Sequence, residues 1–344
     1  MHLIKTNNRI FRYSHTIGSQ SPGGPGFRYP VDLALTKDDI IYVVNRGHDG
    51  EEAHRISVLT TDSEYIGQFG SNGDADGQFI WPVAIAVDKN GLVYLADEWL
   101  NRISVYDCDV DFGGLDFEQK NFLFRWGLAG STQGQISAPA GLAFDSNDNL
   151  YISEGDNHRV SKFTKSGKFL MTFGTKGSSP GQFDTPWGIT IDDKGFIYVA
   201  DWGNDRVQKF TSEGDYLMEF GIPGDVPGKL RSPSSLAVDR DGDVYITDWW
   251  NNKVEIYAED GSHLSTLIGH AEEVSKWGKA YLENNPSDVA NRNLVTDFEP
   301  EYRFMMPSSV AVNDQGYVFI VDSIRFRIQV YQKTRKSDGL ELTL

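Results

Sequence analysis

The sequence predicts an all-β fold, because one strand–turn–strand pattern recurs along the chain of 344 residues. Each copy begins at a proline and reads as an apolar strand, a tight turn rich in Asp, Asn and Gly, and a second strand rich in β-branched and aromatic residues. The six copies begin at Pro30, Pro82, Pro139, Pro186, Pro233 and Pro307. Internal repetition of this kind predicts one repeat architecture instead of two unrelated domains.

Each copy continues with a third strand, such as RVQKF at 206–210, and then with a fourth. The fourth strands are the runs at 65–70, 122–127, 169–174, 216–221 and 263–269. The last copy lacks this strand, and the run YSHTIG at 13–18 has the missing form. We therefore expect the N-terminal strand to complete the last unit, so that six four-stranded blades close into a β-propeller without free edges. The prediction is a single domain over residues 1–344.

The repeat motif, P-x-G-I-x-I-D followed by G-x-I-Y-V-A-D-x-x-N-x-R-V, is clearest at residues 134–163 and 181–210. It resembles the repeat of the NHL-repeat six-bladed β-propeller family, and the resemblance covers nearly the whole chain. The resemblance implies that the first strand of each blade runs down from an upper face. The loops between second and third strands, and the connections before each proline, would then surround the mouth of a central channel on that face.

The composition limits the partners and the location that we expect. The chain carries 32 basic and 49 acidic residues, a net charge of −17, which would repel the phosphates of nucleic acids and acidic membrane surfaces. No apolar run reaches the roughly 18–20 residues that span a bilayer, and the N-terminal residues lack the apolar core of a secretion signal. With a single cysteine, Cys108, the sequence predicts a cytoplasmic monomer without nucleic-acid or membrane partners.

A charged pair recurs around the loop between the second and third strands. An acidic residue closes the second strand at Asp97, Glu154, Asp201, Asp248 and Asp322, with Asn45 in the first blade. A basic residue opens the third strand at Arg55, Arg102, Arg159, Arg206, Lys253 and Arg327. Because the pair is repeated in nearly every blade, we interpret it as a structural clamp on the loop and not as a site.

Residues that break the six-fold pattern are better candidates for a site. Five tryptophans are expected on the upper side of blades 2, 4 and 5: Trp99, Trp187, Trp202, Trp249 and Trp250. Their indole rings either pack between blades or contact a ligand, and aromatic side chains commonly line binding surfaces. The sequence leaves both alternatives open.

A polar cluster is expected in blades 1 and 6. Asp32 stands two residues after its proline, where the other copies have Ala, Gly or Ser, and Arg46 and Arg325 also break the repeat. The three residues either form a neutral seal at the closure of the ring or bind a carboxylate or phosphate at the channel mouth, since Arg offers a planar bidentate fork. In an enzyme, Asp32 would act as a base, and Glu98 and His158 are further catalytic candidates.

Metal binding has only weak support from the sequence. His48 and His54, in the insertion at 47–54, and His158 suit zinc or another divalent ion by ligand type, but their spacing is no fixed motif. The acidic runs at 107–111 and 239–243 are interpreted as turns, because neither has the full spacing of a calcium loop. Amidating lyases of the resembled family use channel histidines, whereas the inner strands here offer Ala34, Ala86, Ala143, Thr190, Ala237 and Ala311. We expect that no cofactor is required.

The connection between blades 5 and 6, residues 269–301, departs most from the repeat. Val274, Trp277, Tyr281 and Leu282 have the spacing of one helical face, and Pro286 ends the pattern. The segment is expected to form a helical insertion on the upper face, either as a cap on strand ends or as a lid over a pocket.

Two functions remain open at the level of sequence. The first is a propeller that binds a small molecule, peptide or protein on its upper face. The second is an enzyme, a hydrolase or lyase with or without assistance by a metal, with its active site at the channel mouth. The fold alone does not decide between them, because activity depends on the site and not on the scaffold.

Overall fold

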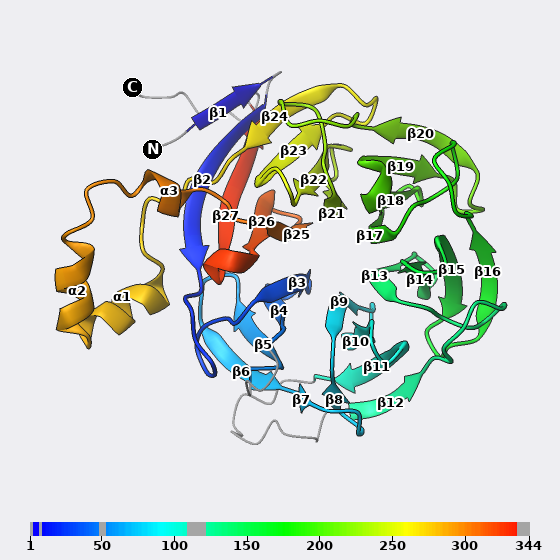
Figure 1. Ribbon diagram of the computed structural model, residues 1–344, viewed down its shortest axis with the longest axis horizontal. Helices are drawn as coiled ribbons and strands as arrows, with labels where there is room; N and C mark the ends of the chain where they lie inside the picture. The colour runs from blue at the N-terminus through cyan, green and yellow to red at the C-terminus, as the bar shows by residue number, and fades with distance from the viewer. Residues whose placement is uncertain (1–2, 7–8, 48–52, 109–121, 336–344) are drawn as a thin grey trace.

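The computed structural model describes residues 3–6, 9–47, 53–108 and 122–335. Its strands form six blades around a central opening, as the sequence predicts (Figure 1). The inner strand of each blade begins at the repeated proline: β3 (Pro30–Leu35), β9 (Pro82–Val87), β13 (Pro139–Phe144), β17 (Pro186–Ile191), β21 (Pro233–Val238) and β25 (Pro307–Val312). We call the face on which these strands begin the upper face.

Each blade is an antiparallel sheet in which the strands follow one another from the centre outward. Blades 1 and 2 add β4 (Ile40–Asn45), β5 (Arg55–Thr60), β6 (Tyr65–Phe69), β10 (Leu92–Asp97), β11 (Arg102–Asp107) and β12 (Phe122–Trp126). Blades 3 and 4 add β14 (Asn149–Glu154), β15 (Arg159–Thr164), β16 (Phe169–Phe173), β18 (Ile197–Asp201), β19 (Arg206–Phe210) and β20 (Tyr216–Phe220). Blade 5 adds β22 (Val244–Asp248), β23 (Lys253–Tyr257) and β24 (His263–Leu267), and a short parallel pair, β7 (Ser71–Asn72) and β8 (Gln78–Phe79), lies between blades 1 and 2.

Blade 6 is closed by the N-terminus, which confirms the predicted closure. It contains β26 (Tyr317–Asp322) and β27 (Arg327–Arg335), and β2 (Arg9–Ile17) pairs antiparallel with β27. The paired strand is longer than the run at 13–18, and β1 (Leu3–Thr6) adds a fifth strand that the repeat did not predict. The first and the last described strands therefore belong to one sheet.

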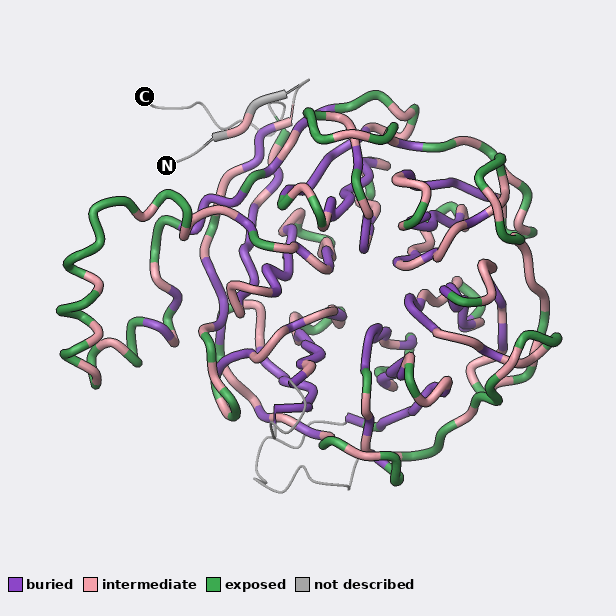
Figure 2. Tube along the Cα trace, viewed as in Figure 1, coloured by how far each residue is buried: buried purple, intermediate pink, exposed green. Residues whose placement is uncertain are grey.

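The hydrophobic core lies between neighbouring blades (Figure 2). One aromatic position of the second strand is buried in every blade: Tyr42, Tyr94, Tyr151, Tyr198, Tyr245 and Phe319. Rings also meet across blade boundaries, as Phe69 and Tyr106 do with centroids 5.0 Å apart. Each buried aromatic side chain contributes about 1.5–3 kcal/mol, so the repeated motif is mainly a packing motif.

The glycine that follows the fourth strand has a steric reason to recur. Gly70 adopts φ 81°, and a Cβ atom there would lie 2.3 Å from the ring of Phe79. Gly18 is equivalent in the closing strand, with φ 97° and a Cβ that would lie 2.4 Å from the ring of Phe27. Only glycine combines this conformation with so close an aromatic neighbour.

The insertion after blade 5 forms α1 (Lys276–Glu283), α2 (Pro286–Arg292) and α3 (Glu299–Tyr302). Ser275 caps α1 by accepting a hydrogen bond from the Gly278 N–H (3.1 Å), and Pro286 begins α2. The helices α1 and α2 project sideways beyond β2, outside the ring (Figure 1), and most of their residues are exposed or half-buried (Figure 2). The expectation of a lid over the upper face is therefore wrong.

Trp277 explains why α1 lies at the rim. Its ring packs edge-on against Phe27 and Tyr65, with centroids 5.6 and 6.2 Å away, and its Nε1–H donates to the Ser63 carbonyl (2.9 Å). Of the apolar face that the sequence predicts, Trp277 is thus covered by the outer part of the blade 6 to blade 1 junction, whereas Tyr281 is 55% exposed. None of the helices in the described part of the chain is long and apolar enough to cross a membrane.

The repeated charged pair acts as a loop clamp in blades 3, 4 and 6. Asp201 is buried, and its carboxylate accepts hydrogen bonds from the Asp184 N–H (2.8 Å) and from Arg206 Nε (2.9 Å). Blades 3 and 6 repeat the ion pair with Glu154–Arg159 (2.9 Å) and Asp322–Arg327 (2.7 Å). Arg206 also donates to the carbonyl oxygens of Ser179 and Gln182, so the clamp ties the loop to the preceding connection.

We expect Asp201→Asn and Arg206→Gln to be stability mutants. Each replaces one member of the buried Asp201–Arg206 ion pair by a neutral side chain, and losing this charge-assisted contact costs about 1–3 kcal/mol of unfolding free energy. Urea unfolding of purified protein measures the loss. Arg240→Gln is the matched control, because Arg240 pairs with Asp314 (2.6 Å) through side chains that are both more than 60% exposed. Equal stability of Arg206→Gln and Arg240→Gln would contradict the clamp.

Candidate functional site

The upper mouth of the channel holds a cavity of about 510 Å³ with a mainly aromatic and apolar lining. We call it the aromatic cup. It is lined by residues that flank the repeated prolines and by residues of the loops after the second strands. Its largest side chains are Tyr29, Trp81, Trp187, Trp202, Trp249 and Met306. The cup therefore combines side chains from all blades except blade 3.

A second cavity of about 280 Å³ lies along the inner strands and forms the central channel. The two cavities share Val31, Val83, Trp187, Ser234 and Ser308 as lining residues. The channel adds polar groups below the cup, among them Asp32, Thr190, Ser235 and Ser309. An apolar entrance thus leads directly into a polar interior.

Three of the five predicted tryptophans line the cup. Trp187 and Trp202 come from blade 4, where Trp202 starts the short 3₁₀ helix η1 (Trp202–Asn204), and their rings lie 6.4 Å apart. Trp249 comes from blade 5. Trp99 and Trp250 do not line the cup, and they are 71% and 51% exposed. The sequence interpretation missed Trp81, which directly precedes the proline of blade 2. It could have been found, because the connections before the prolines were already expected on the upper face.

Arg46 forms one wall of the cup together with Trp81. Its guanidinium carbon lies 4.2 Å from the centre of the Trp81 ring, and its Nε and Nη2 donate to the Pro82 carbonyl (3.3 and 3.2 Å). Burial lowers the pKa of Arg46 to about 10, although Glu98 and Asp97 oppose the shift. Burial also raises the pKa of Glu98, against the nearby charge of Arg46.

The expected cluster of Asp32, Arg46 and Arg325 does not form. Asp32 accepts hydrogen bonds from the Ile85 N–H (2.8 Å) and the Ser309 hydroxyl (2.6 Å), so its carboxylate bridges the inner strands of blades 2 and 6. Arg325 ends the 3₁₀ helix η2 (Ser323–Arg325), which directs its Nη2 to the Pro300 carbonyl of α3 (2.6 Å). Burial raises the pKa of Asp32 to about 6.

His158 has a structural role in the loop of blade 3. It adopts φ 50°, and its Nδ1 accepts a hydrogen bond from the Thr185 N–H (3.1 Å) in the connection to blade 4. Other blades make the same link with a different side chain, as Asn101 does with Ala138 and Asp205 with Ser232. The geometry thus explains His158 without catalysis.

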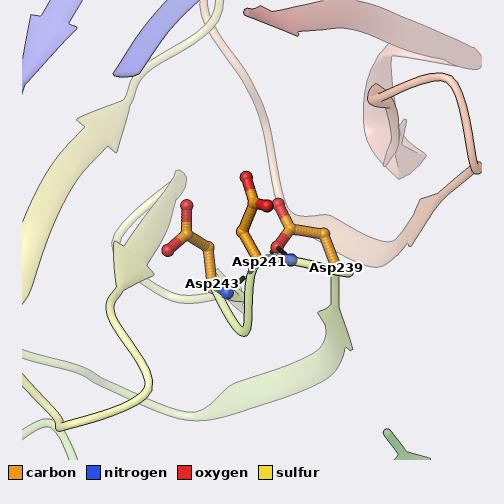
Figure 3. A group of neighbouring side chains, drawn as sticks. All are labelled: Asp239, Asp241 and Asp243. Atoms are coloured by element: carbon orange, nitrogen blue, oxygen red, sulfur yellow. Dashed lines mark hydrogen bonds between the residues drawn. The ribbon is translucent and has the colours of Figure 1, made fainter. Parts of the chain in front are cut away.

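The structure gives the histidines no support as a metal site. His48 lies outside the described residues, and His54 is buried in the loop before β5. Within the described ranges, the one group of three or more potential metal ligands is Asp239, Asp241 and Asp243 (Figure 3). His54 and His158 thus belong to no such group in the described ranges.

That acidic group lies in the turn between β21 and β22, at the end of the inner strand opposite the upper face. Its carboxylates already pair with the ammonium group of a lysine side chain. Lys333 Nζ lies 2.5, 2.9 and 2.6 Å from carboxylate oxygens of Asp239, Asp241 and Asp243. Arg9 Nη2 donates to Asp243 as well (2.6 Å). The interpretation of 239–243 as a turn is confirmed, and both terminal strands anchor it.

Comparison with known families identifies the repeat. A model described as "NHL repeat" matches residues 137–163, 183–210 and 230–257. The chain contains NHL repeats. The matched segments of the NHL propeller cover the first three strands of blades 3, 4 and 5. NHL repeat-containing protein 3 from Mus musculus is 26% identical over 114 residues, which is 32% of this chain and 32% of that protein. The alignment thus spans about a third of the relative.

Solved structures similar to the NHL propeller include lyases and a protein complex. A structure of streptogramin B lyase is 14% identical with a TM-score of 0.56, and the match covers 94% of this chain and 98% of that one. A catalytically inactive virginiamycin B lyase from Staphylococcus aureus with quinupristin is 14% identical with a TM-score of 0.58, covering 94% and 99%. A chain of the nidogen/laminin complex is 17% identical with a TM-score of 0.52, and the match covers 77% of this chain and 92% of that one. At these identities the likeness shows the fold alone.

Proposed function

We propose that the NHL propeller binds a small aromatic or apolar group, carried by a small molecule or a peptide, in the aromatic cup. The observation that supports this is the cavity of about 510 Å³ at the channel mouth, which is lined by four tryptophans. Large aromatic side chains offer rigid apolar area at a low cost in conformational entropy, and pockets of this size and lining are typical of ligand sites. The aromatic and apolar side chains of the lining suit a ligand with a flat ring.

A second candidate function is an enzyme, a hydrolase or lyase. The observation in its favour is Asp32 in the channel below the cup, because a carboxyl group with a pKa of about 6 exchanges its proton near neutral pH. Lyases are among the solved structures with this fold. Glu98 and His158 are weaker catalytic candidates: neither lines the cup or the channel, and His158 is engaged by Thr185.

The binding proposal predicts that Trp249→Ala weakens the binding of aromatic ligands about 5- to 50-fold, the usual effect of truncating an aromatic contact residue. A ligand-observed NMR screen of aromatic fragments, followed by titration of the hits, measures this effect. Trp99→Ala is the matched control, because Trp99 is on the upper side but outside the cup. A library without hits, or hits that bind wild type and Trp249→Ala equally, would contradict the proposal.

We propose further that binding needs no metal and that the chain acts as a cytoplasmic monomer. A single cysteine, which is buried, and the negative net charge of −17 support these expectations. Fragment binding that is unchanged after treatment with a chelator, together with a monomeric mass in light scattering, is the expected result. Binding lost on chelation would overturn the first expectation.

A further inference from the structure

Asp32, which is half-buried in the channel, differs from the buried acidic residues of the blades in its charge balance. Glu154, Asp201 and Asp322 each form an ion pair with an arginine of the same blade. Asp32 accepts hydrogen bonds from Ile85 and Ser309, but no cationic side chain of the described chain is paired with it. A carboxylate that is removed from bulk water without a cation is unfavourable, so its environment favours a positive charge nearby.

The position of Asp32 gives a ligand access to this carboxylate. Asp32 lines the channel, and the channel continues into the aromatic cup through the shared residues Val31, Val83 and Trp187. Among the described side chains that line the two cavities, Asp32 is the one acidic group and Arg46 the one basic group. Arg46 is stacked on Trp81 and bonded to Pro82, so its charge is directed at the wall of the cup.

Resting on the proposed function of the cup, we propose that its ligand carries a protonated amine, and that the amine enters the channel to pair with the Asp32 carboxylate while the apolar part of the ligand stays among the tryptophans. The Asp32 carboxylate accepts hydrogen bonds from the Ser309 hydroxyl and from the backbone N–H groups of Ile85 and Leu33, and its two oxygens have further lone-pair capacity for an ammonium group. The faces of the cup tryptophans also attract a cation on its way to the channel. At pH 7.5, above its pKa of about 6, the carboxyl group is mainly ionised.

Three probes of similar shape and different charge test the proposal: 2-phenylethylamine, 2-phenylethanol and phenylacetate. Their dissociation constants for the wild-type chain are measured by NMR titration at pH 7.5 and low salt. We expect the amine to bind about tenfold or more tighter than the alcohol, the factor expected of one charge-assisted hydrogen bond, and phenylacetate to bind weakest. Equal binding of amine and alcohol would overturn the proposal and leave the cup intact. Tighter binding of phenylacetate would overturn it in favour of Arg46, and failure of all three probes would count against the cup itself.

The variant Asp32→Asn tests the charge of the carboxylate independently of the other groups in the channel. Asparagine can accept the hydrogen bond of the Ile85 N–H and donate one to the Ser309 hydroxyl, so the fold is expected to persist. In this variant the amine should lose its advantage over the alcohol, whereas the exposed control Asp314→Asn should keep it. An amine preference that survives in a folded Asp32→Asn protein would overturn the assignment. If Asp32→Asn fails to fold, the probe series on the wild-type chain still decides between the charges.

Discussion

Deletion of residues 1–18 is expected to remove most of the stability of the propeller. The deletion takes away β2, which pairs with β27 from Arg9↔Arg335 to Ile17↔Ile328. It also removes the buried side chains of Ile10, Phe11 and Ile17, each of which contributes about 1.5–3 kcal/mol. The sum is comparable with the whole stability of a typical domain, so we expect a non-cooperative melt and aggregation through the open edge of β27.

Circular dichroism melting and size-exclusion chromatography measure this result. Deletion of residues 1–8 is the control, because it removes β1 and keeps all of β2. The shorter deletion should still melt cooperatively as a monomer. A wild-type melting curve for the 1–18 deletion would show that the ring does not depend on its N-terminal strand.

The second large effect is expected for Lys333→Met. Lys333 is the cation shared by Asp239, Asp241 and Asp243, and its side chain is 5% exposed. Removing one partner of a buried ion pair leaves an uncompensated charge and costs about 3–5 kcal/mol. Here carboxylates would also repel one another within a group whose ligand atoms lie within 4.8 Å.

Urea unfolding at pH 7 provides the measurement, with Lys194→Met as the matched control. Lys194 pairs with Glu259 at 2.7 Å on the surface, so its loss should not change the unfolding free energy measurably. Arg335 Nε also donates to Asp241 (2.9 Å). If Lys333→Met is as stable as Lys194→Met, then Arg9 and Arg335 suffice to neutralise the three carboxylates.

The fold could be predicted in detail because six copies of one motif can be compared with one another. The repeated prolines mark the starts of six inner strands, and the missing fourth strand of the last copy indicated the closure by β2. The charged pairs were assigned to structure for the same reason, and Asp201 with Arg206 confirms that assignment. β1 was missed, because it has no counterpart in the other blades.

The candidate site was predictable only in part, because a residue that departs from the repeat does not reveal where its side chain points. Trp187, Trp202 and Trp249 were placed on the correct face, yet the sequence could not distinguish them from Trp99 and Trp250. Arg325 was expected beside Asp32, but the turn of η2 directs it to α3. The amphipathic pattern around Trp277 predicts a helix, while the place of that helix depends on the tertiary contacts of Trp277 with Phe27 and Tyr65.

The pairing of β2 with β27 also sets an order of events during synthesis on the ribosome. About 310 residues separate Ile17 from Arg327, and translation adds roughly 5–20 residues per second. The nascent chain therefore carries β2 without its partner for tens of seconds, while the five preceding blades can already assemble. Throughout that interval β2, with the apolar side chains of Phe11 and Ile17, can pair with strands of other chains. Such pairing is prevented only when β27 has left the exit tunnel and pairs with β2.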